Sequence, residues 1–176
     1  KNVVEPNEIL ENYGIDATRV FMISDSPPDR ELEWTDEGIQ SSKNLVNRIH
    51  RYFSKKKGDV SLEIKKEIEK FVHNIENNIL NFSLNKCVAD IYTLFNYLEK
   101  KNVYLYDDKL SKRILICLFP IVQNLSRSLN KNLFKSSGFE KWPEINADLL
   151  LENRLKLPIQ IHGKLITTLD TTKGYS

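Results

Sequence analysis

The sequence predicts a mostly α-helical protein, in which an antiparallel helical bundle follows a short helical connector and precedes a β-hairpin. Apolar residues recur every three or four positions over several long segments, as on the buried face of a helix, and short polar turns separate these segments. Apolar and polar residues alternate near the C-terminus, which is typical of a strand. We therefore expect a connector over residues 1–34, a bundle over 35–140, and a linker with the hairpin of a truncated domain over 141–176.

The connector is expected to contain two short helices. Pro6 suits a first helical turn, and Gly14 can end that helix because glycine tolerates a positive φ. Asp16 can cap a second helix over residues 17–24. The Pro-Pro pair at 27–28 prevents this helix from continuing.

The bundle is expected to consist of longer helices. Thr35 or Asp36 caps one that reaches about Lys55, and Ser61 caps the next. The run ILICLF is apolar on all sides, so its helix should be the most enclosed, and Pro120 either kinks it or starts another helix. The predicted apolar stripes comprise Ser42, Val46, Ile49 and Phe53, with Leu45 and Tyr52 beside them; Ile64, Ile68, Phe71, Val72, Ile75 and Ile79; and Leu84, Cys87, Val88, Ile91, Leu94, Phe95 and Leu98.

The C-terminal hairpin is predicted from alternation over residues 155–161, a turn at His162–Gly163, and a return strand from Lys164 to Leu169. Pro158 favours an edge position, because proline lacks a backbone N–H. An isolated hairpin is only marginally stable, so we expect the beginning of a second domain that is cut short.

Several classes of site are not indicated. No stretch has the length of a membrane span, no signal peptide opens the chain, and the first residue is Lys1, so we expect an excised or processed fragment. Cys87 and Cys117 lack a Cys-x-x-Cys partner and are predicted to be small core residues in a reducing compartment. The sequence has no phosphate-binding loop and no cluster with metal-ligand spacing, so we assign no catalytic and no metal-binding residue.

Charge is distributed unevenly along the chain. Residues 1–40 hold ten acids and three bases, whereas the remaining residues hold 14 acids and 23 bases. A basic surface of this kind favours a polyanionic partner such as a nucleic acid.

The segment NVVEPNEILENYGIDATRVFMISDSPPDRELEWTDEGIQSSKNLVNRI is similar to the segment that follows the Lys-Met-Ser-Lys-Ser loop in class Ia leucyl-tRNA synthetases of the bacterial and organellar type. Its YG-x-D-x-x-R part is shared with valyl and isoleucyl enzymes, whereas SPPDRELEW points to the leucyl branch. Trp142-Pro143 and the run IQIHGKL resemble that branch's linker and the first hairpin of its C-terminal α/β domain. The family's Asn-Pro…Pro-His segment is replaced here by FPIVQNLSRSLNKNLF. Asn44, one turn before Arg48, stands where relatives often carry a basic residue.

This resemblance implies a role in translation. The intact enzyme would join leucine to tRNA(Leu) with ATP and Mg²⁺ through an adenylate, whereas this fragment would hold no cofactor and catalyse nothing by itself. Its partners would be tRNA(Leu) and the upstream catalytic domain of the same chain, in a monomeric cytoplasmic enzyme that does not contact a membrane. Arg19 could reach a carbonyl or carboxylate and fix the connector, and Trp34 is expected to anchor packing.

The candidate tRNA-binding residues are cations. Arg48, Arg51 and Lys55 are expected on one helical face, opposite the apolar stripe, where they could contact phosphates. The resemblance adds Arg48 as a position of the family's pattern and Lys164 as a basic position in the C-terminal hairpin. The full set of candidates is Arg48, Arg51, Lys55, Lys56, Lys57 and Lys164.

Other interpretations remain open at this stage. Cations in the last turn of a helix also oppose its dipole and need no ligand. The chain could be the equivalent bundle of a valyl- or isoleucyl-tRNA synthetase. It could also be a non-enzymatic helical module that binds protein, in which case binding would be insensitive to salt, whereas RNA binding should weaken steeply as salt rises.

Overall fold

The computed structural model describes residues 5–24, 32–55, 60–104, 108–136, 138–139, 141–150, 154–161 and 164–172. The chain divides into two compact units, Lys1–Ile145 and Asn146–Ser176. The first unit contains α1 (Pro6–Tyr13), α2 (Ile15–Ser24), α3 (Asp36–Phe53), α4 (Leu62–Leu80), α5 (Leu84–Lys100), α6 (Asp108–Leu118) and α7 (Gln123–Phe134). The second contains α8 (Ala147–Leu150), β1 (Arg154–Ile161) and β2 (Lys164–Thr172). The prediction of a mostly helical protein is confirmed for these residues.

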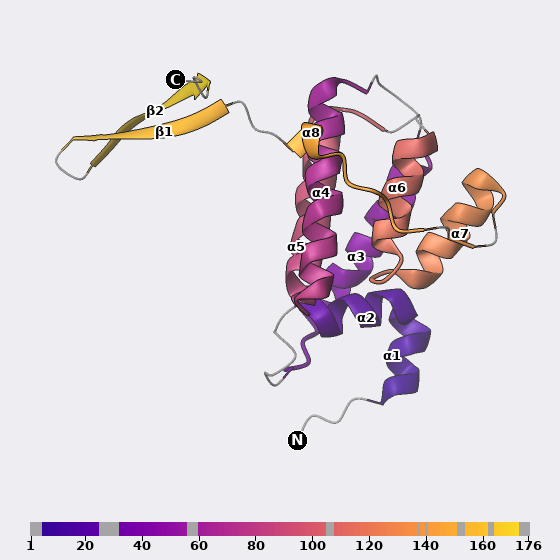
Figure 1. Cartoon of the computed structure of the whole chain (residues 1–176). Coiled ribbons are helices and arrows are strands. Elements are labelled where there is room, and N and C mark those ends of the chain that lie inside the picture. Colours follow the sequence, from indigo (N-terminus) through magenta and orange to yellow (C-terminus); the bar gives the residue numbers. More distant parts are fainter. Residues whose placement is uncertain are drawn as a thin grey trace. The chain divides into compact units, whose positions relative to one another are not determined.

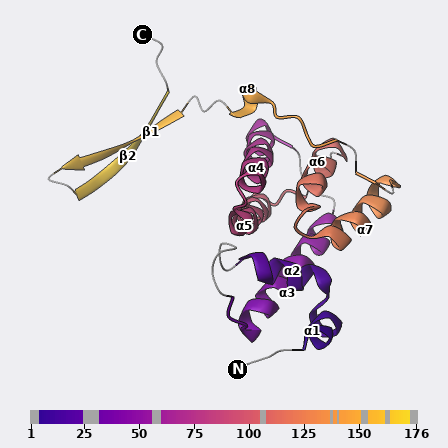
Figure 2. The same cartoon turned by 60° about the horizontal axis from the view of Figure 1, so that its bottom comes forward.

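The long helices of the first unit pack side by side (Figure 1). Helix α4 lies against α5 and α6, and α6 in turn packs against α7, while α2 contacts α3, α5 and α7 (Figure 2). The break at Pro120 separates α6 from α7, so this proline marks the start of a new helix and not a kink. The largest fully buried side chains lie at the predicted stripes and in the run ILICLF; they include Tyr52, Phe95, Ile49, Ile68, Ile75, Ile91, Leu98, Ile114, Leu115 and Leu118.

Two predicted caps are present at the starts of the longest helices. The Thr35 hydroxyl accepts a hydrogen bond from the Gly38 N–H at 3.2 Å, and the Ser61 hydroxyl accepts one from the Ile64 N–H at 3.3 Å. Both side chains satisfy an amide that the helix itself leaves without a partner.

The predicted cap at Asp16 is wrong. Helix α2 begins at Ile15, so Asp16 lies within its first turn, and its carboxylate reaches another helix. Its two oxygens accept hydrogen bonds from the backbone N–H groups of Asn124 and Leu125, at 3.1 and 2.7 Å, in the first turn of α7. The residue therefore caps a helix, but one that follows it by more than 100 positions.

Arg19 and Trp34 lie as expected. The guanidinium of Arg19 donates to the carbonyl oxygen of Pro120 at 3.1 Å and to the Gln123 side chain at 3.3 Å, so it joins α2 to the turn between α6 and α7. Trp34 packs edge-on against Phe21, with ring centroids 4.8 Å apart, in a small apolar cluster that also contains Ala17 and Ile39.

In the second unit, β1 and β2 pair antiparallel over the segments where the sequence alternates. Leu157 lies opposite Leu169, and Ile161 opposite Lys164, with an irregularity in register between Ile159 and Gln160. The predicted turn at His162–Gly163 lies outside the described residues.

Candidate nucleic-acid interface

Helix α3 separates a buried apolar face from an exposed polar one. Its buried residues are Ile39, Ser42, Leu45, Ile49, Tyr52 and Phe53. Between Gly38 and Lys55 the sequence contains no Asp or Glu, since the helix's only acids, Asp36 and Glu37, lie in its first turn. The exposed side chains after that turn include Asn44, Asn47, His50, Arg51 and Lys55. We call these five residues the α3 face. Amides, imidazole and cations are groups that can donate to phosphate oxygens.

Arg51 and Lys55 carry the positive charge of the α3 face. Arg51 is exposed in the last turn of α3, and Lys55 is exposed just beyond it. The ammonium group of Lys55 lies 4.8 Å from the centroid of the Tyr104 ring, a cation–π distance that leaves it on the surface. Both cations are therefore accessible to solvent, as the sequence predicts.

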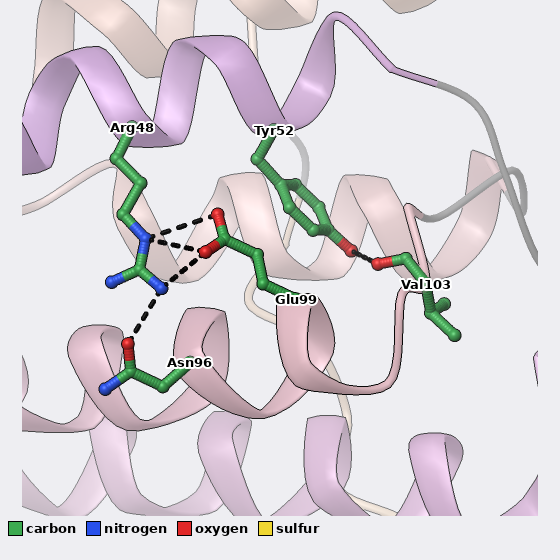
Figure 3. A network of polar contacts seen from close by, with 5 residues as sticks. All are labelled: Arg48, Tyr52, Asn96, Glu99 and Val103. Carbon is green, nitrogen blue, oxygen red and sulfur yellow. Dashed lines mark hydrogen bonds and ion pairs between the residues drawn. The ribbon is translucent and has the colours of Figure 1, made fainter.

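Arg48 is placed differently from the prediction. Its side chain is about one-fifth exposed and lies against α5 instead of projecting with Arg51. Nε donates to both carboxylate oxygens of Glu99 at 3.2 Å, and Nη2 donates to Glu99 at 2.8 Å and to Asn96 at 2.7 Å (Figure 3). The predicted face is corrected in this respect: the carboxylate neutralises much of the Arg48 charge, and the residue joins α3 to α5.

Buried contacts of Tyr52 hold the C-terminal end of α3 in place. The hydroxyl of Tyr52, which is buried, donates to the carbonyl oxygen of Val103 at 3.0 Å (Figure 3). The Tyr52 ring packs edge-on against Phe95 at 4.9 Å between centroids. The last turn of α3, with Arg51 on its outer side, is thereby held on a rigid support.

The other candidates of the sequence are not described at the side-chain level. Lys56 and Lys57 lie outside the described residues, and Lys164 is described only as the first residue of β2.

On α4, Lys65 is exposed, whereas Lys70 forms an ion pair with Glu67 at 3.5 Å. The mixed charge of α4 makes it a less favourable surface for a polyanion than the α3 face.

Two polar partners that position these elements were not predicted from the sequence. Glu99 holds Arg48 from 51 positions away, and Glu69 on α4 binds the Arg113 guanidinium of α6 at 2.7 and 2.8 Å. The Glu69 side chain is nearly fully buried, and Arg113 also donates to the carbonyl oxygen of Glu144 at 2.9 Å. No local pattern predicts such pairs, because the partners are remote in the chain.

Neither a metal site nor a reactive thiol is found among the described residues. They contain no group of three or more His, Cys, Asp or Glu side chains that could hold a metal ion. Burial raises the pKa of Cys87 to about 11 and that of Cys117 to about 12, so both thiols stay protonated at neutral pH. None of the described helices combines the length and the apolar character that crossing a bilayer requires.

Comparison with known proteins identifies relatives over nearly the whole chain. It is 33% identical over 178 residues to the leucine–tRNA ligase of Novosphingobium aromaticivorans, covering 99% of this chain and 21% of that protein. It is 33% identical over 180 residues to that of Zymomonas mobilis, and 30% identical over 181 residues to that of Wolbachia sp. subsp. Drosophila simulans. The chain spans about a fifth of the length of these relatives, from 21% to 22%. No protein-family model matches the chain.

A solved structure has the same fold. The LeuRS of Agrobacterium radiobacter K84, determined as a ternary LeuRS–tRNA–LeuAMS complex, superposes with a TM-score of 0.80 at 23% identity, over 99% of this chain and 25% of that one. The relatives and this structure agree with the resemblance seen in the sequence. Over nearly its entire length, the chain is therefore homologous to one segment of the leucine–tRNA ligases.

Proposed function

We propose that this chain is the tRNA-binding segment of a leucyl-tRNA synthetase and that the α3 face contacts the tRNA backbone. The observation that carries the proposal is the composition of that face, which has exposed cations and amides and no acid after its first turn. A surface of this kind suits phosphate oxygens, so we expect it to recognise the shape and charge of tRNA(Leu).

The cations in and just after α3 would contribute unequally. Arg51 and Lys55 are exposed and would contact phosphates directly. Arg48 is held by Glu99 and would mainly keep α3 in place on α5, while retaining a smaller share of the contact. Lys56 and Lys57, which follow Lys55 in the sequence, extend the proposal, and Lys164 extends it to the hairpin, as the sequence resemblance implies.

The intact enzyme would supply the chemistry. By homology, an upstream catalytic domain would activate leucine with ATP and Mg²⁺, and residues 1–34 would couple that domain to the bundle of residues 35–140. Residues 141–176 would be the linker and first hairpin of a C-terminal α/β domain. We infer a monomeric, cytoplasmic enzyme, in which this segment orients tRNA(Leu) and is itself inactive. The leucine–tRNA ligase relatives favour this assignment over a valyl or isoleucyl enzyme.

Binding to tRNA(Leu) at several salt concentrations tests the proposal. Fluorescence anisotropy with labelled tRNA should show affinity that falls steeply between 50 and 200 mM salt, on the order of tenfold or more if several phosphates are contacted. The variant Arg51→Gln/Lys55→Gln should bind more weakly and lower the slope of log Kd against log salt by about 2.

The matched control is Lys86→Gln/Lys131→Gln, which removes two exposed cations from α5 and α7. Its net charge equals that of the first variant, so it corrects for the general loss of attraction. Equal affinities and slopes for the two variants would contradict a role of the α3 face, and absence of tRNA binding by the unmodified chain would instead favour a protein-binding module.

A further inference from the structure

The most exposed large apolar side chains lie in the turn between α4 and α5. Phe82 is 76% exposed and Leu80 is 72% exposed, more than any other large apolar side chain among the described residues. Residues 81–83 join the two helices, which pack side by side (Figure 1). We call Leu80, Asn81 and Phe82 the α4–α5 corner. Every other aromatic side chain in the described part of the chain is buried or half-buried.

Phe82 has a backbone conformation that suits glycine. Its φ is 52°, in the left-handed region, where the Cβ of an L-residue lies too close to the following carbonyl oxygen. The N–H of Phe82 donates to the carbonyl oxygen of Ile79 at 3.1 Å, and that of Ser83 donates to the oxygen of Asn78 at 2.7 Å. These two bonds form a Schellman motif, which usually has glycine at the position of Phe82.

Helix α5 ends in the same motif but with a different residue. Asn102 has a φ of 53°, and its N–H donates to the carbonyl oxygen of Glu99 at 2.9 Å. The next N–H donates to the oxygen of Leu98 at 3.0 Å. Asparagine adopts this conformation more readily than phenylalanine does, and its polar side chain suits an exposed turn. Neither the backbone nor the exposure therefore accounts for a phenyl ring at position 82, and such outliers are often found at functional sites.

The α4–α5 corner has a fixed support. Ile79 before the corner and Leu84 after it pack against the buried core, and Ile75 and Cys87 are fully buried one turn further on each side. The ring of Phe82 is therefore presented from a backbone that is anchored at both ends. A platform that is ordered before binding lowers the entropy that binding costs.

The chemistry of the α4–α5 corner suits RNA better than protein. The sequence has no Asp or Glu between Glu76 and Asp90, and the exposed side chains there include the amides of Asn77 and Asn81. Amides can hydrogen-bond the edges of an unpaired base. One exposed phenyl ring offers roughly 150 Å² of surface, whereas each partner in a standard protein–protein interface contributes about 800 Å². A single base, in contrast, can cover such a ring by stacking.

We propose that Phe82 is a stacking platform for an unpaired base of RNA. This inference rests on the proposed tRNA-binding function, and it extends that function from phosphate contacts to the face of a base. Stacking on a ring tolerates any base, because every base has a π-face. The contact is neutral, so it adds affinity without adding salt dependence.

Affinity measurements with tRNA(Leu) separate the ring from the backbone that carries it. Phe82→Gly removes the ring at a position that glycine fits, so the thermal midpoint should stay the same or rise by about 2–4 °C. Anisotropy should nevertheless show binding weakened about fivefold or more, with an unchanged slope of log Kd against log salt. The control Leu80→Ala removes exposed apolar surface without a ring and should bind like the unmodified chain. A lower thermal midpoint for Phe82→Gly would show that the ring supports the fold and would overturn the proposal.

The fluorescence of a Phe82→Trp variant tests stacking directly. tRNA(Leu) should quench the introduced indole, after subtraction of the signal that Trp34 and Trp142 give in the unmodified chain. An RNA duplex of about 40 base pairs, whose bases are almost all paired and stacked, should leave the introduced indole unquenched.

The combined results distinguish the failure of this proposal from the failure of the proposed function. If Phe82→Gly binds like Leu80→Ala and the introduced indole is not quenched, while Arg51→Gln/Lys55→Gln is impaired, the stacking proposal is wrong and the proposed function stands. Equal quenching by the duplex would show contact with paired RNA and would also overturn the stacking proposal. Absence of tRNA binding by the unmodified chain would overturn both.

Discussion

Asp16 shows how one side chain can join two parts of the chain. The N-cap residue of α7 is Val122, and its side chain has no oxygen that could accept a hydrogen bond from the first amides of the helix. Asp16, which is buried, supplies that oxygen from α2 and accepts hydrogen bonds from the backbone N–H groups of Asn124 and Leu125. Arg19 satisfies the Pro120 carbonyl oxygen on the same turn. Together, the two side chains fix α2 to the turn before α7 and to the start of α7.

We predict that Asp16→Ala lowers the free energy of unfolding by about 1–2 kcal/mol, because two amides in the first turn of α7 lose their acceptor. Urea denaturation monitored by circular dichroism measures this change. Glu11→Ala, at an exposed position of α1, is the control and should change stability by less than about 0.5 kcal/mol. Equal stabilities of the two variants would mean that Asp16 does not cap α7.

Gly38 is needed because another side chain occupies the space of a Cβ. A Cβ built at this position would lie 2.6 Å from the Phe21 ring and 2.7 Å from the Thr35 hydroxyl. Alanine normally stabilises a helix by about 1 kcal/mol relative to glycine. Here we expect Gly38→Ala to destabilise the protein, because the ring of Phe21 must move away from Trp34.

A double-mutant cycle tests whether the ring of Phe21 is the reason why Gly38→Ala is destabilising. In a Phe21→Leu background, which removes the ring, Gly38→Ala should cost less than in the unmodified chain, and a double-mutant cycle measures the difference. Additive effects in the cycle, or a stabilising Gly38→Ala, would show that the close approach of Phe21 does not matter.

At the scale of elements, the Arg48–Glu99 pair determines how much charge α3 presents. Both side chains are partly exposed, at 20% and 35%, so solvent screening limits the contribution of the pair to about 0–1 kcal/mol. Its larger consequence is electrostatic. The Glu99 carboxylate opposes the approach of a polyanion to the neighbouring α3 face.

We therefore predict that Glu99→Gln tightens binding of tRNA(Leu) and steepens its salt dependence, because Arg48 is freed from its counter-ion. The change in slope should approach 1, the value for one added phosphate contact. Anisotropy titrations with Glu11→Gln as the charge-matched control measure it. If both variants bind alike, Arg48 lies away from the RNA and acts only between α3 and α5.

At the scale of the whole molecule, the buried thiols link stability to pH. The pKa values of Cys87 and Cys117, about 11 and about 12, lie above the ordinary value of 9.0, and burial is the main cause. The unfolded chain therefore loses its thiol protons before the folded one does. Stability from this source is complete below pH 9, declines as pH rises, and levels off above about pH 12.

We predict that the free energy of unfolding falls between pH 8 and pH 10 by about 2–3 kcal/mol more in the unmodified chain than in Cys87→Ala/Cys117→Ala. The variant will be less stable at pH 8, since alanine leaves cavities in the core, but its pH dependence should be flatter. Urea midpoints at the two pH values give the comparison. Parallel losses in both proteins would show that the thiols titrate normally in the fold.

Much of the fold could be predicted from the sequence because its signals are local. The spacing of apolar residues located the long helices, and the caps at Thr35 and Ser61 act within three residues. The partners of Asp16, Arg48 and Arg113 lie 108, 51 and 44 positions away, so nothing in the local pattern distinguishes them from surface charges. Arg51 and Lys55 were predicted correctly as exposed, because helical periodicity is a local signal. The bond that holds Arg48 to α5 was not predicted, because its partner is remote in the chain.

Site-specific crosslinking tests whether RNA lies along the outer face of α3. The native thiols are buried, so a benzophenone maleimide will label only an introduced cysteine. Asn47→Cys places the label one turn before Arg51, and Asn132→Cys places it at an exposed position of α7 as the control. With tRNA(Leu) at 50 mM salt, we predict crosslinks from position 47 and few from 132. Equal yields from both positions, or crosslinks only from 132, would show that RNA does not lie along this face of α3.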